Sequence, residues 1–523
     1  MRIVHLLLTL SVSLSAQEFR ANITGIVQDP SGAPVAGAKI TVKDLDRNLT
    51  ITTETNEVGA EGVAREAFTR DRNNWQPRAG VAWQFRPRWV MRGGYGLYYL
   101  GQNAFGPETG FSRPTALIAS TDNNLTPAVS LSDPFPRSLF PSGLLVPIGS
   151  SQGLATDLGL AVSAQFLNRP LPYSHQFSFG LQRVLPNQWL VDASYVGNLT
   201  RKLPVNASLN FVPTSALTAL PVGDRPGNFN AQVTNPLAGL LPGSAFNGAT
   251  VPRQQLLFAY PQYSQVGLQA LPVGGQSYHS LQMKATRRYA NGIAAQVSYT
   301  WQKTLERVTL LNSQDVLLNN FTGIQPEQRL VEFDTPHAFS AVATYELPFG
   351  TGKKIAGHLP KWANALVGGW NVSAQYMFRS GTPLEFPNAA PLANRSAALS
   401  PAERDERAVK AGRSEFNPFF DKWFDTTLFP RQAQAPFTLR DFPTRFPDVR
   451  SPHLASWEMS GYKQFAIRER VRIQVRADFQ NALDYAYFGR LVTANVTDSR
   501  FGQLNPAQDN QPRTAVLVLK VLF

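Results

Sequence analysis

Three arginines near the end of the chain have the spacing most suggestive of chemistry. Arg470, Arg472 and Arg476 share one side of segment 470–479, because side chains in a β-strand alternate between two faces. The other face is apolar and consists of Val471, Ile473, Val475, Ala477 and Phe479. Positive charges lining a pore would favour anionic solutes, and Arg183 and Arg379 are further candidates for such a lining. The alternative is that these charges pair with a plug inside such a pore or with one another.

Other reactive side chains form no recognisable site. The six histidines (His5, His175, His279, His337, His358 and His453) lack metal-ligand spacing, and we interpret His279 and His337 as polar residues at strand ends. The glycine-rich segment 92–96 lacks the Lys-Ser/Thr and the helix of a phosphate loop. The acids of the mixed-charge segment 403–413 are expected to be solvated in a loop. We therefore expect no enzyme activity, no metal site and no cofactor.

The elements that would position the arginines are amphipathic strands. We predict about eleven of them, at 79–85, 89–99, 173–185, 189–197, 278–289, 293–304, 337–347, 369–379, 454–465, 470–479 and 514–523. Short turns alternate with connections of about 30 to 80 residues, and Asn291-Gly292 is the strongest hairpin signal. In the last strand Leu517, Leu519, Val521 and the terminal Phe523 share one face, which is expected of a strand that closes and assembles an outer-membrane barrel.

The alternation of connection lengths indicates a membrane β-barrel. Short periplasmic turns, long extracellular loops and spanning strands of about ten residues are typical of outer-membrane barrels. Aromatic residues such as Trp83, Trp89, Trp301 and Trp457 lie near strand ends, where the boundaries between membrane and water would be. The alternative is a large soluble β-sandwich or propeller, which would explain neither the loop asymmetry nor the aromatic terminus.

Composition supports an envelope protein. The 523 residues carry a formal net charge of +13, but the Lys and Arg residues are scattered, which argues against nucleic-acid binding. Cysteine is absent, which excludes disulfides and thiolate metal sites. Residues 1–16 have the pattern of a secretory signal peptide, with a buried N-terminal element as the alternative. No later run of about 18 apolar residues predicts a membrane-spanning helix.

Two segments resemble known families. Residues 17–62 are expected to contain short strands at 23–28, 38–43 and 49–54. Gly25, Val27, Asp29, Gly32 and Pro34 give this segment a resemblance to the start of the carboxypeptidase regulatory-like domain, a small β-sandwich that would be only partial here. A junction at 63–76 leads to the expected barrel segment 77–523, and residues from about 70 to 523 are similar to TonB-dependent outer-membrane receptors of the Oar-like type. The matching segments include Asn73-Asn74-Trp75-Gln76-Pro77-Arg78-Ala79-Gly80-Val81-Ala82-Trp83, Val297-Ser298-Tyr299-Thr300-Trp301, Phe479-Gln480-Asn481-Ala482-Leu483-Asp484 and the ending up to Phe523.

The resemblance implies an all-β transporter in the bacterial outer membrane that takes up a bulky solute. Its partners would be outer-membrane lipid, the barrel-assembly machinery, an unidentified solute and, where a coupling segment exists, the TonB complex. Between residues 59 and 73 neither a plug domain nor the first half of a barrel is recognisable. The alternative to a working transporter is therefore a shortened receptor that does not transport. Eleven antiparallel strands could close only through one parallel pair. A structural or adhesive surface protein that binds polysaccharide is a second functional hypothesis.

Overall fold

The protein is described here by a computed structural model. It describes residues 39–44, 49–54, 71–101, 115–141, 143–146, 157–166, 168–241, 244–308, 326–386, 396–431, 434–438, 444–468 and 471–523. The chain divides into two units, one formed by 1–66 and 110–156 and the other by 67–109 and 157–523. The predicted signal peptide and the predicted strand at 23–28 lie outside the described residues.

The first unit contains one described pair of strands. β1 (Lys39–Asp44) pairs with β2 (Leu49–Glu54) in antiparallel register. The sequence predicts strands at 38–43 and 49–54, so both elements are confirmed. The partial sandwich and the domain boundaries stay predictions.

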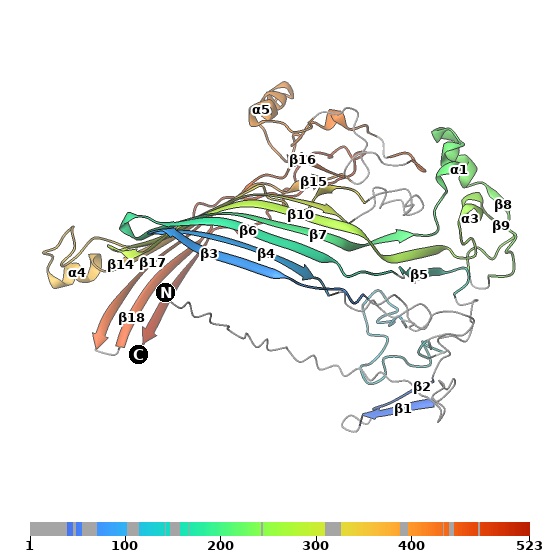
Figure 1. Cartoon of the computed structure of the whole chain (residues 1–523), viewed down its shortest axis with the longest axis horizontal. Coiled ribbons are helices and arrows are strands. Elements are labelled where there is room, and N and C mark those ends of the chain that lie inside the picture. Colours follow the sequence, from blue (N-terminus) through green and yellow to red (C-terminus); the bar gives the residue numbers. More distant parts are fainter. Residues whose placement is uncertain are drawn as a thin grey trace, which may run out of the picture. The chain divides into compact units, whose positions relative to one another are not determined.

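The second unit is built on one large sheet (Figure 1). Its principal path runs through eleven strands in the order β19-β18-β17-β14-β13-β11-β10-β7-β6-β4-β3, with antiparallel neighbours throughout. The strands are β3 (Arg78–Arg86), β4 (Trp89–Tyr99), β6 (Tyr173–Val184), β7 (Trp189–Ser208), β10 (Gln265–Ala290), β11 (Ile293–Arg307), β13 (His337–Glu346), β14 (Trp370–Arg379), β17 (Leu454–Arg468), β18 (Val471–Gln480) and β19 (Thr514–Leu522). Each corresponds to a predicted strand.

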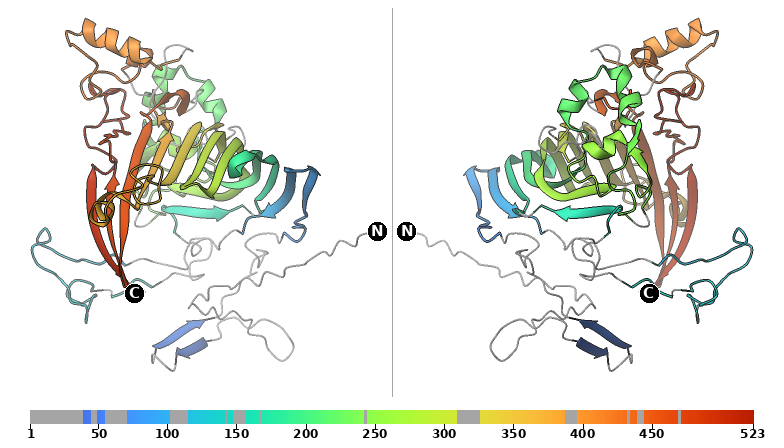
Figure 2. Two further views of the ribbon diagram at one scale, coloured as in Figure 1. Left: turned by 90° about the vertical axis from the view of Figure 1, so that its left-hand side faces the viewer. Right: turned by 90° about the vertical axis from the view of Figure 1, so that its right-hand side faces the viewer.

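The sheet is curved and open (Figure 2). The described strands β3 and β19 form its two edges and do not pair with each other. At the turn between β10 and β11, Asn291 and Gly292 have φ values of 52° and 79°. Both residues therefore adopt the left-handed conformation that a two-residue hairpin requires, as the Asn-Gly signal predicts.

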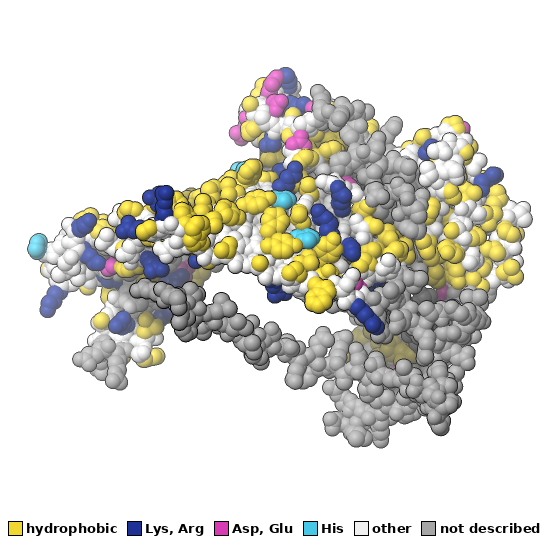
Figure 3. Space-filling model, viewed as in Figure 1, with side chains coloured by type: hydrophobic (Ala, Val, Ile, Leu, Met, Phe, Trp, Pro, Cys, Tyr) yellow, Lys and Arg dark blue, Asp and Glu magenta, His cyan; other side chains and the backbone are white. Residues whose placement is uncertain are grey.

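The register separates an apolar face from a polar face. On β18 and β19, Val475 lies opposite Leu519 and Ala477 opposite Leu517. Leu517 is 82% exposed and Phe523 is 96% exposed, so other parts of the protein leave these apolar side chains largely uncovered. Figure 3 shows hydrophobic side chains gathered over the strands. Among the described residues, no helix is long and apolar enough to cross a membrane.

Two strands continue far beyond their predicted ends. β7 extends past Gly197 to Ser208, and β10 begins at Gln265 although its predicted start is Tyr278. The register between these strands shifts near Leu271, Gly274 and Gly275, so the glycines accompany bulges within a continuing strand. β5 (Ala161–Gln165) adds a parallel partner to the extension of β10.

The long connections contain secondary structure that the sequence did not predict. The connection between β7 and β10 contains α1 (Thr214–Thr218), α2 (Arg225–Phe229), β8 (Gln232–Thr234), β9 (Thr250–Pro252) and α3 (Arg253–Leu257). The other long connections contain β12 (Arg329–Leu330), β15 (Pro383–Glu385), α5 (Pro401–Lys410) and β16 (Arg445–Arg450). The short-turn end carries α4 (Lys361–Val367) between β13 and β14. Single 3₁₀ turns lie at Pro186–Gln188, Val222–Asp224 and Thr426–Leu428.

The connections have their own apolar cores. One core joins the β14–β17 and β18–β19 connections and consists of Leu384, Phe386, Ala397, Phe424, Leu428, Phe429, Val449, Val496 and Phe501. Phe386 is completely buried and contacts the rings of four other phenylalanines. A second core joins Val212, Leu217, Phe229 and Phe258 to Phe437. Burial of these side chains makes the connections folded structures.

The expectation of a loop at 403–413 was wrong for most of that segment, but the acids Glu403, Asp405 and Glu406 are exposed to solvent as expected. Pro401–Lys410 is helical, and Ser400 caps it by accepting a hydrogen bond from the Glu403 backbone amide. The Glu403 carboxylate in turn accepts a bond from the Ser400 amide at 2.7 Å. This reciprocal capping box satisfies two backbone donors at the start of α5. The hydrogen bonds from Ser400 hold the pKa of Glu403 below its ordinary value.

Candidate functional site

The arginines on β18 lie on the polar face of the sheet. Arg472 is exposed and lies opposite Leu522, and the Arg476 guanidinium pairs with Asp478 at 2.7 Å. Arg470 lies outside the described residues. Asp478 neutralises Arg476, so Arg472 is the exposed arginine of the predicted row among the described residues of this strand. For Arg476 the structure favours the alternative in which charges pair with one another.

The inclusion of Arg183 among the lining candidates was wrong. Arg183 lies opposite Trp89 and Val191, on the apolar face of the sheet near a short turn. Its guanidinium lies 4.6 Å from the centre of the Trp89 ring, a cation–π contact that lets the charge remain at the edge of an apolar surface. Arg379 lies opposite Ala338, on the polar face, where the sequence placed it.

The four predicted assembly residues lie on the edge strand or directly after it. Leu517, Leu519 and Val521 alternate along β19 and are exposed, and Phe523 follows the strand. They share the apolar face with Val475 and Ile473 of β18. Their position agrees with the pattern, and their role in assembly stays a prediction.

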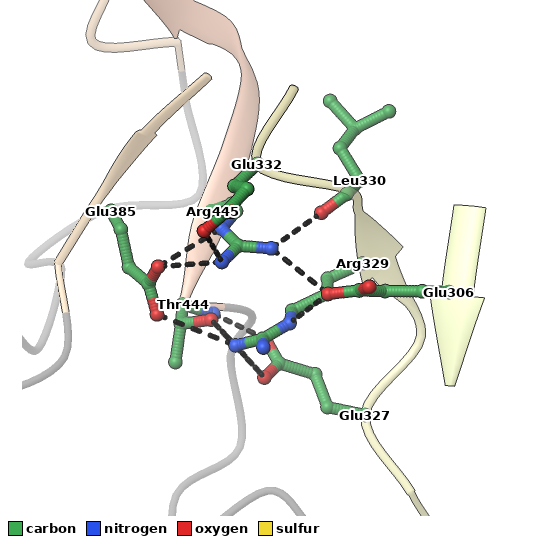
Figure 4. A network of polar contacts seen from close by, with 8 residues as sticks. All are labelled: Glu306, Glu327, Arg329, Leu330, Glu332, Glu385, Thr444 and Arg445. Atoms are coloured by element: carbon green, nitrogen blue, oxygen red, sulfur yellow. Dashed lines mark hydrogen bonds and ion pairs between the residues drawn. The ribbon is translucent and has the colours of Figure 1, made fainter. Parts of the chain in front are cut away.

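An ion-pair network lies where the long connections meet β11 (Figure 4). The Arg445 guanidinium contacts Glu306 at 2.9 Å and Glu385 at 2.7 Å, and it also donates to the carbonyl of Leu330 at 3.0 Å. Arg329 contacts the same Glu306 at 3.0 Å. Figure 4 shows both guanidinium groups pointing toward the Glu306 carboxylate, which lies at the end of β11. The network thus joins β11, β12, β15 and β16.

Burial makes this network sensitive to the loss of any partner. The Arg445 side chain is 5% exposed, that of Arg329 10% and that of Glu327 2%. Glu327 is held by Arg329 and by the backbone amide of Thr444, which donates a short hydrogen bond to it. Removing one partner from a buried ionic network leaves an uncompensated charge. The network therefore fixes how these connections are anchored to the strands.

A second buried pair anchors the same region. Arg450 donates to Asp334 at 2.8 Å, and the Asp334 side chain is 1% exposed. The other oxygen of Asp334 accepts the backbone amide of Thr304 at 2.8 Å, beyond the last residue of β11 that pairs with β13. Asp334 therefore replaces a strand partner at this position. Its carboxylate is fully engaged.

Helix α5 is attached to the aromatic core through charged contacts. Arg407 donates to both oxygens of Asp425, at 3.1 and 2.9 Å. Burial alone would raise the pKa of Asp425, but hydrogen bonds from Arg407 and Thr427 outweigh it and hold this pKa at about 2. The guanidinium of Arg404 lies 3.6 Å from the centre of the Trp423 ring, and burial lowers the Arg404 pKa.

The polar face contains a hollow toward the long-connection ends of β3 to β10. Its volume is about 530 Å³. The lining includes Arg78, Gly94, Gly96, Tyr98, Gln176, Ser178, Asn198 and Tyr278. Arg78 lies 4.5 Å from the centre of the Tyr98 ring, and the Tyr278 hydroxyl donates to Gln302 at 2.9 Å. Phenol, amide and guanidinium groups around a shallow hollow suit a polar solute with an apolar face.

Sequence reasoning missed the network, the hollow and the two cores. Glu306, Arg329, Glu385 and Arg445 are scattered over 140 positions, from 306 to 445, with no shared spacing. For α5 a signal was present, since Ser400-Pro401-Ala402-Glu403 has the capping-box pattern with proline at the first helical position. Within the part that the structure describes, no group of three or more His, Asp or Glu side chains could hold a metal ion.

Comparison with known families decides the class of the protein. A family model described as an outer membrane beta barrel domain matches residues 25–515. The chain is a member of this outer-membrane β-barrel family. It accordingly resides in the bacterial outer membrane. The polar face of the sheet is then the inner face of a barrel wall, and the apolar face is the lipid side.

Solved structures of outer-membrane transporters are similar at low identity. The outer membrane transporter YddB from Escherichia coli is 11% identical with a TM-score of 0.37, over 83% of this chain and 38% of that one. The siderophore receptor PiuA from Acinetobacter baumannii is 8% identical with a TM-score of 0.35, over 85% and 35%. The chain thus spans less than two fifths of these proteins. No curated protein matches it.

Proposed function

We propose that this chain is the barrel portion of an outer-membrane receptor of the TonB-dependent type, which takes up a bulky solute. The observation that carries the proposal is the two-faced antiparallel wall whose long connections are folded and anchored at one end. A barrel that served only as a membrane anchor would not need the two apolar cores and the buried ion-pair network that its long connections contain. Folded connections present a fixed surface, which specific capture requires.

The inner hollow supports the same proposal. It lies on the polar face, and Tyr98 and Tyr278 offer flat apolar surfaces beside the amides of Gln176 and Asn198. A solute that passes from the connections into the barrel would meet these groups. Fixed charge on the inner face, from Arg472, would then act on anionic groups of that solute.

Uptake measurements test the proposal directly. A strain lacking the gene would be complemented with the full chain in hosts with and without TonB. Growth would be compared on oligosaccharides as sole carbon source and on ferric chelates as sole iron source. We expect complementation on at least one source, and we expect it to disappear without TonB. Binding of polysaccharide to whole cells without TonB-dependent uptake would instead indicate the adhesive surface protein.

A further inference from the structure

Three tyrosine–histidine pairs repeat along the lipid side of the sheet. In each pair a tyrosine hydroxyl lies within hydrogen-bond distance of a histidine Nδ1, and the two ring centres lie 6.0 to 6.1 Å apart with their planes inclined by 21° to 33°. The pairs are Tyr95–His175 at 2.8 Å, Tyr195–His279 at 2.7 Å and Tyr299–His337 at 2.7 Å. Each histidine is in the strand that follows a long connection, and each tyrosine is in the strand before that connection.

The three pairs have the same geometry in the strand register. The histidines lie opposite Leu97, Gly197 and Trp301, which are each two residues beyond the tyrosine of the pair. Each tyrosine therefore reaches diagonally across to the neighbouring strand, a distance that long aromatic side chains can span. Identical geometry at three strand boundaries indicates one structural device used three times.

The pairs also lie at one depth. His175 of β6 lies opposite Leu199 of β7, and Leu199 lies opposite Ser277 of β10. His279 is therefore offset by two residues along β10 from the residue that is in register with His175. His279 lies opposite Lys303 of β11, whereas His337 of β13 lies opposite Trp301. The offset between these two histidines is therefore again two residues over two strands. A shift of one residue per strand, with a rise of ~3.4 Å and a strand spacing of ~4.8 Å, corresponds to a strand tilt of about 35°. This is the tilt of membrane barrels, so the pairs form a belt parallel to the membrane surface.

The belt carries hydrogen-bond donors at the boundary of the apolar surface. When the tyrosine hydroxyl donates to Nδ1, the imidazole proton resides on Nε2, the ring nitrogen farther from the backbone. Lys303 lies directly opposite His279 and is exposed. Among the described residues, no carboxylate pairs with Lys303. Figure 3 shows histidines within the hydrophobic surface and Lys or Arg side chains beside them.

The middle pair borders a cavity. The cavity has a volume of about 420 Å³, and its lining includes Tyr195, His279, Leu281, Trp301 and Lys303. Asp334 and Arg450 are also in the lining, where they pair with each other at 2.8 Å, so the carboxylate of Asp334 does not neutralise the charge of Lys303. The lining therefore combines an ammonium group and an imidazole with the apolar surface of Leu281 and Trp301.

We propose that this belt binds phosphate groups of outer-leaflet lipids, and that the His279–Lys303 cavity is its principal site. A lipid phosphate would accept hydrogen bonds from Lys303 Nζ and His279 Nε2, while its acyl chains contact Leu281 and Trp301 below the belt. An exposed cation at a lipid boundary that has no protein carboxylate is matched by an anionic headgroup. The proposal needs only the membrane location of the chain, with its long connections on the extracellular side, and is independent of transport.

Lipid binding by the full chain, purified from outer membranes in mild detergent, tests the proposal. The probes are a phosphorylated lipid A and the same lipid after removal of its phosphates, with bound lipid counted by native mass spectrometry. Wild-type protein should bind the phosphorylated probe at least tenfold more tightly. The variants His279→Gln and Lys303→Gln should each weaken that binding several-fold, and both changes together should abolish the preference for phosphate.

Matched controls lie at the other end of the strands. His358→Gln and Lys354→Gln remove an exposed histidine and an exposed lysine in the connection between β13 and β14, and they should bind as wild type does. Equal binding of the two probes by wild-type protein would overturn the proposal without any variant. Unchanged binding by the double variant, or equal loss in the controls, would overturn the assignment to this site.

Discussion

Replacing Arg445 by methionine should release the long connections from the strands. Methionine has similar length but no charge, so Glu306 and Glu385 lose contacts of 2.9 and 2.7 Å and the Leu330 carbonyl loses its donor. The Glu306 side chain is only 16% exposed, whereas Glu385 is 39% exposed and can be hydrated. Breaking a buried pair by removing one partner costs about 3–5 kcal/mol, and the exposure of Glu385 places our expectation at the lower limit, about 3 kcal/mol.

Hydrogen exchange measures this loss locally. If the connections open as one unit, the amides of β15 and β16 should exchange roughly 150-fold faster in the variant, since each 1.4 kcal/mol is a factor of ten. The amides of β18 should not change. The control is Arg500→Met in the connection between β18 and β19. Arg500 pairs with Asp498, but its side chain is 62% exposed, and exposed ion pairs contribute little to stability. Unchanged exchange in β15 and β16 of the Arg445 variant would refute the anchoring role of the network.

Three further outcomes follow from the folded connections and the inner face. Phe386→Ala should cost the aromatic core about 3–5 kcal/mol, and protease should then cleave the β14–β17 connection while the strands stay protected. Acid should weaken the attachment of α5, because the folded-state pKa of Asp425 is depressed to about 2: the contribution of Asp425 to stability is present above the ordinary pKa of 3.8 and is lost as pH falls from about 4 toward 2. Hydrogen exchange at α5 would follow this loss, and Asp425→Asn would remove the pH dependence. Arg472→Gln should reduce anion preference in bilayer conductance more than Arg476→Gln, because Asp478 already neutralises Arg476; equal effects would contradict the pairing.

The sequence predicts the wall well because one physical rule governs it. Alternation of apolar and polar side chains locates β4 at its observed bounds, Trp89–Tyr99, and locates β18 to within one residue. The rule fails at β10, where Pro272, Gly274 and Gly275 suggest a break but lie within a bulged, continuing strand.

The candidate sites could not be predicted in the same way. The partners of Arg445 come from three separate strands, and only the folded chain brings them together. The belt depends on register, because Tyr195 and His279 are 84 positions apart and meet only when β7 pairs with β10. Local patterns carry no information about such contacts.

Single-cysteine labelling tests the central claim, a membrane barrel wall with one lipid side, most directly. The chain contains no native cysteine, so each introduced thiol is alone. In outer membranes, Gln474→Cys on the polar face of β18 should react with a water-soluble maleimide, whereas Val475→Cys should react only with a lipophilic maleimide. This alternation is the predicted result. Equal reaction of both positions with the water-soluble reagent would contradict the account.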